Sequence, residues 1–132
     1  HLENYSKVLN IEALTMLEMA RRDIMPAVSS YLRELSETAT AIHAVSVTAD
    51  CSYEESIIPE MSALLGDAYR SLDEALMGAK TVEGSQALAN YYRDKVFSAM
   101  AELRITIDQL ETMTPSDKWP VPSYGDLLFS VR

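Results

Sequence analysis

Val96-Phe-Ser-Ala-Met-Ala-Glu-Leu-Arg-Ile-Thr-Ile-Asp-Gln-Leu110 is the stretch that decides the fold. Its apolar residues recur in steps of four, three, four and three, at Val96, Met100, Leu103, Ile107 and Leu110. This heptad-like spacing places them on one face of an α-helix and is typical of helices that pack in antiparallel bundles. The same face continues upstream through Leu88 and Tyr92. The pattern therefore predicts a helix over about residues 85–114.

A longer helical pattern opens the chain. Glycine is absent before Gly66, and apolar residues recur at helical spacing over about residues 5–47. Pro26 falls inside this pattern, where a proline removes a backbone hydrogen bond and collides with the preceding turn. We therefore predict one long first helix that is kinked between Arg22 and Met25, near Pro26. Its expected core stripe consists of Leu9, Ala13, Leu17, Ala20, Ile24, Val28, Tyr31, Leu35, Ala39, Ile42 and Val45.

The middle of the chain predicts a second helix over about residues 52–78. Ser52 followed by Glu55 forms a capping-box pattern, which marks a helix start. Gly78 and Gly84 bracket the turn that reverses the chain. The fold predicted from these patterns is all-α, an antiparallel bundle of three long helices. The core stripe expected on the second helix consists of Ile58, Met61, Leu65, Ala68, Leu72, Ala75 and Leu76.

Residues 115–132 form a different kind of segment. Three prolines oppose further helix and favour an extended backbone. Burying a large apolar side chain stabilises by roughly 1.5 to 3 kcal/mol, so we expect this extended aromatic tail to dock, either on the bundle or on another part of a longer protein. The apolar residues concerned are Trp119, Tyr124, Leu127, Leu128 and Phe129.

Composition narrows the functional classes. A chain of 132 residues with 48% hydrophobic residues fits one globular domain. No window approaches the ~18 uninterrupted apolar residues of a membrane span. The formal net charge of −9 repels phosphate backbones and anionic lipid headgroups. We therefore expect neither nucleic acid nor a membrane as a partner.

The single cysteine and the first residues of the chain indicate the cellular compartment. Cys51 is the sole cysteine, so an intrachain disulfide is impossible, and the start lacks a signal-peptide pattern. A reducing cytoplasm fits these features best. The chain begins at His1 without a methionine, inside a helical pattern. We interpret residues 1–132 as a single helical domain that is a fragment of a longer chain.

Residue types that could carry chemistry are few. His43 lies on a helical stripe, as a phosphotransfer histidine would, but Ala44-Val45-Ser46 replaces the Lys and Gly that usually follow such a histidine. Thr40 stands where a carboxylate-bridged metal site needs a Glu three residues before the His. The acidic residues do not form a calcium loop, and a solvated helix face explains them better. We predict no catalytic, cofactor-binding or metal residue. The acidic residues concerned are Glu54, Glu55, Glu60, Asp67, Asp73 and Glu74.

Three segments in the same order carry a family resemblance. They are Asn10-Ile-Glu-Ala-Leu-Thr-Met-Leu-Glu-Met-Ala20, Tyr91-Tyr-Arg-Asp-Lys-Val96 and Trp119-Pro-Val-Pro-Ser-Tyr-Gly-Asp-Leu-Leu-Phe-Ser-Val131. From Tyr5 to Val131 the chain resembles the C-terminal region of type III glutamine synthetases. Enzymes of this family ligate ammonia to glutamate with ATP and a divalent metal, Mg or Mn, in ring-shaped oligomers. Their Lys-Pro and Asn-Gly-Ser-Gly nucleotide-binding motifs do not occur in this sequence.

The resemblance implies an accessory domain with a structural or assembly role. It implies no cofactor in this chain, and ATP with Mg or Mn in the parent enzyme. The implied partners are the catalytic domain of the same chain and neighbouring subunits of a homo-oligomer, a dodecamer. The alternative from the residues alone is an independent interaction module that holds a partner helix in a Met- and Tyr-rich groove. The residues expected to be structural or to lie at an interface are Trp119, Pro120, Pro122, Tyr124, Leu127, Phe129, Tyr92 and Arg93.

Overall fold

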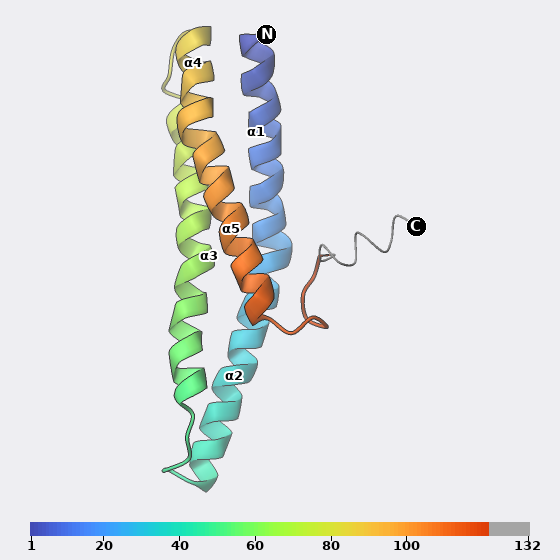
Figure 1. Ribbon diagram of the computed structural model, residues 1–132, viewed down its shortest axis with the longest axis vertical. Coiled ribbons are helices and arrows are strands. Elements are labelled where there is room, and N and C mark those ends of the chain that lie inside the picture. The colour runs from blue at the N-terminus through green and yellow to red at the C-terminus, as the bar shows by residue number, and fades with distance from the viewer. Residues whose placement is uncertain (122–132) are drawn as a thin grey trace, which may run out of the picture.

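Three long helical runs make up the fold (Figure 1). The computed structural model describes residues 1–121. Over that range it contains no strand, so the predicted all-α class with three helices is confirmed. The runs are α1 (Leu2–Met19), η1 (Ala20–Ile24) and α2 (Met25–Val45), then α3 (Ser52–Ala79), then α4 (Ser85–Tyr91), η2 (Tyr92–Val96) and α5 (Phe97–Met113).

The first run bends at η1, a π-helical stretch immediately before Pro26. Met25 donates its backbone N–H to the carbonyl of Ala20, five residues earlier. This wider turn gives room to the proline ring, which in a regular α-helix collides with the carbonyl four residues before it. Figure 1 shows the run changing direction along this stretch, where the sequence predicted a kink. As a result, α1 and α2 have different neighbours.

A second π-helical stretch, η2, interrupts the third run. Phe97 donates its backbone N–H to the carbonyl of Tyr92, again five residues earlier. This stretch is not predicted by the sequence, because no proline marks the place. Tyr92 and Val96, at the two ends of η2, are both buried, so the core face continues across the wider turn. The buried apolar residues of this run are Ala89, Tyr92, Val96, Ala99, Leu103, Ile107 and Leu110.

The core lies where all three runs pack together. Here α3 contacts α1, η2 and α5, and α1 also contacts α4. We call this part the three-helix section, and it comprises α1, η1, α3 from Met61 onward, and the third run. Removing these side chains from water is the main stabilising term of the fold. Its largest fully buried side chains are Ile24, Met61, Leu72, Leu103, Leu110 and Val96.

Beyond the end of α5, α2 and the start of α3 continue as a pair (Figure 1). We call residues 29–60 the two-helix projection. The expected core stripe is buried as far as Val28, the one buried residue of α2. The stripe prediction is wrong at Ile42 and Val45, which are exposed. In a pair, each helix has one neighbour, so a stripe is only partly covered.

Asp50, rather than the predicted Ser52, caps α3. The Oδ1 atom of Asp50 accepts hydrogen bonds from the backbone N–H of Ser52 at 3.0 Å and from its hydroxyl at 2.6 Å. Ser52 itself makes no capping bond, and the first residue before the helix is Cys51. An aspartate two residues before a bonded N–H forms a local turn of this kind. The capping-box prediction was therefore wrong, although α3 does begin at Ser52.

Candidate interaction site

The helix α1 presents apolar residues on two faces. Leu9, Ala13 and Leu17 are buried against the other helices. On the other face Val8, Ile11 and Leu14 are 44%, 63% and 51% exposed. Apolar residues that gather on one exposed face of a helix mark a candidate contact surface. The second face of α1 is therefore the candidate interaction surface of the described residues.

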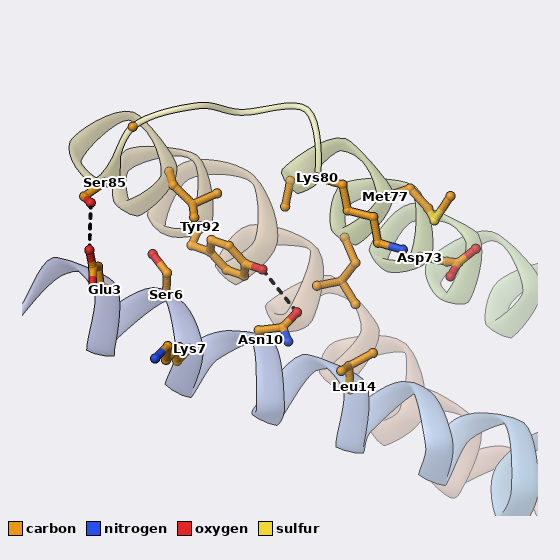
Figure 2. A pocket seen from close by; sticks show the side chains of 14 residues that line it. Glu3, Ser6, Lys7, Asn10, Leu14, Asp73, Met77, Lys80, Ser85 and Tyr92 are labelled. Carbon is orange, nitrogen blue, oxygen red and sulfur yellow. Dashed lines mark hydrogen bonds between the residues drawn. The ribbon is translucent and has the colours of Figure 1, made fainter.

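A groove lies beside this face, between α1 and the facing ends of α3 and α4 (Figure 2). It has a volume of about 780 Å³, and Leu76, Ala79 and Leu88 form part of its apolar lining. A second hollow of about 650 Å³ is lined by residues of α1 and η1 alone and shares Leu14 with the first. We call the two hollows together the α1 furrow. It follows the chain from Glu3 to Asp23, a length of ~30 Å at the helical rise of 1.5 Å per residue.

Tyr92 anchors one wall of the furrow. Its hydroxyl donates to Oδ1 of Asn10 at 3.1 Å, across the gap between the third run and α1 (Figure 2). Burial raises the pKa of Tyr92, and the neighbouring Tyr91 acts in the same direction. The phenol therefore stays protonated and remains a donor at neutral pH. Because Oδ1 of Asn10 is engaged, its amide nitrogen is the group that Asn10 can offer to a ligand.

Ser6, one turn before Asn10, also points into the groove (Figure 2). Its side chain is 5% exposed, and Oγ has no hydrogen-bond partner among residues 1–121. An unpaired buried polar group costs ~1 to 3 kcal/mol. The buried hydroxyl of Thr114 avoids this cost by donating to the carbonyl of Leu110, four residues earlier.

The predicted interface residues do not form one cluster in the described part of the chain. Tyr92 lines the groove. Trp119 is half-buried and packs on the core, and its Nε1 is buried without a hydrogen-bond partner among residues 1–121. Arg93 is exposed and pairs with its neighbour Asp94 at 2.9 Å. Pro120 is exposed, and Pro122, Tyr124, Leu127 and Phe129 lie outside the described residues.

The other residues considered for chemistry have local roles. Nε2 of His43 donates to the carbonyl of Ala49 at 3.0 Å and closes the loop between α2 and α3. Burial raises the pKa of the Cys51 thiol, and the nearby carboxylate of Glu54 raises it further. In residues 1–121 no group of three or more His, Cys, Asp or Glu is placed to hold a metal ion. Over the same range, no helix combines the length and apolar character needed to cross a membrane.

Neither Ser6 nor the furrow was predicted from the sequence. A signal was present, because Val8, Ile11 and Leu14 follow each other at steps of three beside the stripe of Leu9 and Ala13. Such a double pattern gives α1 more apolar surface than one neighbouring face can cover. This pattern did not predict the position of the first hollow, because that hollow forms where α3 ends and α4 begins opposite α1.

Comparison with known proteins relates this sequence to a family. Residues 1–43 match the family described as Glutamine synthetase C-terminal domain. A glutamine synthetase of Butyrivibrio fibrisolvens is 33% identical, over 99% of this chain and 19% of that protein. A type-3 glutamine synthetase of Dictyostelium discoideum is 25% identical, over 96% of this chain and 18% of that protein. A glutamine synthetase of Bacteroides fragilis (strain YCH46) is 27% identical, over 98% of this chain and 19% of that protein.

The matches cover nearly all of this chain but only a small part of each relative. The chain spans about a fifth of the length of these relatives, at 19%, 18% and 19%. No solved structure matches it. The similarity nevertheless covers nearly the whole chain in each relative, and the domain description agrees with the resemblance carried by its three segments. This chain is homologous to the C-terminal domain of glutamine synthetases.

Proposed function

We propose that this chain is the C-terminal helical accessory domain of a type III glutamine synthetase. The observation that carries the proposal is the similarity to a glutamine synthetase along 99% of the chain. The assignment to type III is supported by the type-3 enzyme among the relatives and by the three segments quoted above. The parent enzyme would ligate ammonia to glutamate, using ATP and Mg or Mn bound outside this chain.

In this proposal the domain has a structural or assembly role and supplies no catalytic residue. Its three helices pack as an antiparallel bundle and present apolar surface to the catalytic domain of the same chain or to a neighbouring subunit. The exposed face of α1, with Val8, Ile11 and Leu14, supports such a role because it is apolar without being covered. The parent would be cytoplasmic, which agrees with a single buried and unpaired Cys51. The family resemblance implies that it would be a homo-oligomer, a dodecamer.

The first test is the coding sequence upstream of His1. The proposal expects several hundred residues that carry the nucleotide and metal motifs of the family. A start codon at or just before His1 would contradict it. The alternative, an independent module that holds a partner helix, predicts that start codon. It is favoured by one observation, a furrow lined by Met77, Met19 and Tyr92.

The second test concerns assembly of the full-length enzyme. Trp119→Ala combined with Phe129→Ala should weaken the oligomer, because both side chains are expected to bury apolar surface. Tyr53→Ala, at an exposed aromatic residue on α3, is the control and should leave assembly unchanged. Light scattering after size-exclusion chromatography gives the mass, and a coupled assay gives the activity. An unchanged dodecamer with unchanged activity after deletion of the domain would exclude the assembly role.

A further inference from the structure

We propose that an amphipathic α-helix from the remainder of the parent enzyme lies in the α1 furrow. Its apolar side chains would cover Ile11 and Leu14, and one hydrogen-bonding side chain would meet Ser6 and Asn10. The inference rests on the proposed function, because the occupant belongs to the polypeptide outside residues 1–132. The relatives support its existence, since the matched region is only 19% of the first relative's length.

The dimensions of the furrow favour a helix over a small ligand. The two hollows share Leu14 and together extend ~30 Å along the first run, which is the length of a helix of about 20 residues. The first hollow has α1 as one wall and α3 and α4 as the other (Figure 2), whereas the second is lined by residues of α1 and η1 alone. A helix placed there would be the fourth member of a bundle, and docking of an amphipathic helix in a groove is a common recognition mode.

The charge around the furrow limits the kind of occupant. In the first hollow, Glu3 and Asp73 are balanced by Lys7 and Lys80. In the second hollow, Glu18 and Asp23 lie beside Arg22, which pairs with Glu18. With four carboxylates and three cations, the lining has a formal charge of −1. A helix with balanced charges on its facing side therefore fits this lining better than a strongly basic or strongly acidic one.

Ser6 and Asn10 define the chemistry of the central contact. They lie one turn apart on α1, and the bond from Tyr92 fixes the Asn10 amide. Asn10 offers an N–H donor, and Ser6 offers a hydroxyl without a partner among residues 1–121. A carboxamide or carboxylate side chain can accept from both groups. Such a contact would set the register of the incoming helix, as single buried polar residues do in coiled coils.

Photo-crosslinking in the full-length enzyme identifies the occupant. The probe is p-benzoylphenylalanine at position 11, and the control is the same probe at position 105. Ile11 and Ile105 are both isoleucines, 63% and 60% exposed, but Ile105 lines neither hollow. We expect position 11 to crosslink to a peptide outside residues 1–132 with apolar residues at helical spacing. Position 105 should give a different peptide or none.

Two other results would overturn the inference. Position 11 could crosslink to nothing outside residues 1–132, or to a peptide without helical spacing. If deletion of the domain still dissolves the oligomer, the proposed function stands and only the furrow occupant is wrong. If the coding sequence holds no catalytic region, the proposed function and the inference both fail.

Ser6→Ala tests the polar contact separately. In the isolated chain this substitution removes an unpaired buried hydroxyl, so the melting temperature should stay unchanged or rise. In the full-length enzyme it removes a hydrogen bond, and the dissociation constant of the oligomer should rise roughly five- to ten-fold. Ser36→Ala is the control, because Ser36 bonds to its own helix at Leu32. An equal change in both contexts, or none in the oligomer, would overturn the contact.

Discussion

The three-helix section and the two-helix projection are built from the same kind of sequence and differ in burial. Both carry apolar residues at helical spacing, yet Leu72 and Leu103 are fully buried whereas Leu35 is half-buried. In the first, each helix packs between two neighbours. In the second, α2 packs chiefly on α3. A stripe therefore predicts which residues face a neighbour, and the number of neighbours decides how deeply they are buried.

Local contacts replace a core at the tip of the projection. Val45 and Val47 are 92% and 86% exposed. The loop between α2 and α3 is instead closed by His43 on Ala49 and by Asp50 on Ser52. Regions with few buried apolar contacts open at low free energy without global unfolding. We therefore expect the projection to exchange its amide hydrogens faster than the three-helix section.

The largest expected effect separates the two sections by the same truncation. Leu103→Ala leaves a cavity in a fully buried site and should destabilise the chain by ~2 to 5 kcal/mol. Leu35→Ala, in the half-buried stripe of α2, should cost about 1 kcal/mol, because the site can collapse or fill with water. Urea unfolding followed by circular dichroism measures both. Equal losses would contradict the division into two sections.

Two glycines of α3 provide the next test, with effects of opposite sign. A Cβ at Gly78 would collide with the Tyr91 hydroxyl, which donates to the carbonyl of Ala75 at 2.7 Å. Overpacking of ~1 to 3 kcal/mol outweighs the ~1 kcal/mol gain in helix propensity, so Gly78→Ala should destabilise. At Gly66 a Cβ meets nothing within 4 Å. Gly66→Ala should therefore stabilise by ~0.5 to 1 kcal/mol.

Tyr91→Phe separates the collision from other causes. It removes the hydroxyl that a methyl group at position 78 would meet. In this background Gly78→Ala should cost less than in the wild-type chain, and thermal unfolding of the four variants gives the coupling energy. A cost that is unchanged in the Tyr91→Phe background would exclude the hydroxyl as the reason.

Part of the fold could be predicted from the sequence. Periodicity predicted three helices and the stripe from Leu9 to Val28, because each local pattern agrees with its packing. It failed at Ile42 and Val45, because exposure there depends on where α5 ends. It also missed η2, where no residue type marks the wider turn. The capping error arose because Asp50 accepts from the backbone N–H of Ser52, the group that the Glu55 side chain would bond in a capping box.

The interaction site was less predictable than the fold. Tyr92 was singled out from the family resemblance, but its bond to Asn10 joins residues 82 positions apart, which no local pattern encodes. The groove arises where α3 ends and α4 begins opposite α1, so it depends on the three-dimensional arrangement. Ser6 looks like an ordinary helical serine in the sequence. Only the missing bond to its own helix distinguishes it.

A pH titration tests the local cap of the projection. Hydrogen bonds from the hydroxyl and the backbone N–H of Ser52 hold the pKa of Asp50 below its usual value. A lowered folded-state pKa means that the stabilisation is fully present above the unfolded pKa of about 3.9 and is lost as pH falls through the folded value. Amide exchange in the first turn of α3 should therefore accelerate, after correction for intrinsic rates, in acid below about pH 4.

Asp50→Asn provides the control for this titration. An asparagine retains an oxygen that can accept from Ser52 but has no ionisable group. The corrected exchange of the first turn of α3 should then lose its pH dependence below pH ~4, while the cap at neutral pH is retained in part. If the variant shows the same acid acceleration as the wild-type chain, a group other than Asp50 controls the tip.

The smallest expected change in stability concerns the contact between the segment that follows α5 and the base of the two-helix projection. Nζ of Lys118 lies 2.7 Å from Oε2 of Glu34 on α2, and the two side chains are 34% and 56% exposed. Exposed ion pairs contribute little and are screened by salt, since the Debye length falls to about 3 Å at 1 M. Lys118→Met keeps the apolar stem, so its loss of stability should be near the limit of measurement in urea and should vanish at high salt.

Trp119→Ala, at the next residue, should behave differently, because Trp119 packs on the core rather than through charge. Its loss of stability should be larger, and 1 M salt should leave it unchanged. If the loss from Lys118→Met is the larger of the two and persists at high salt, charge holds the segment to α2. The projection would then depend on electrostatics at its base as well as on the partial burial of its stripe.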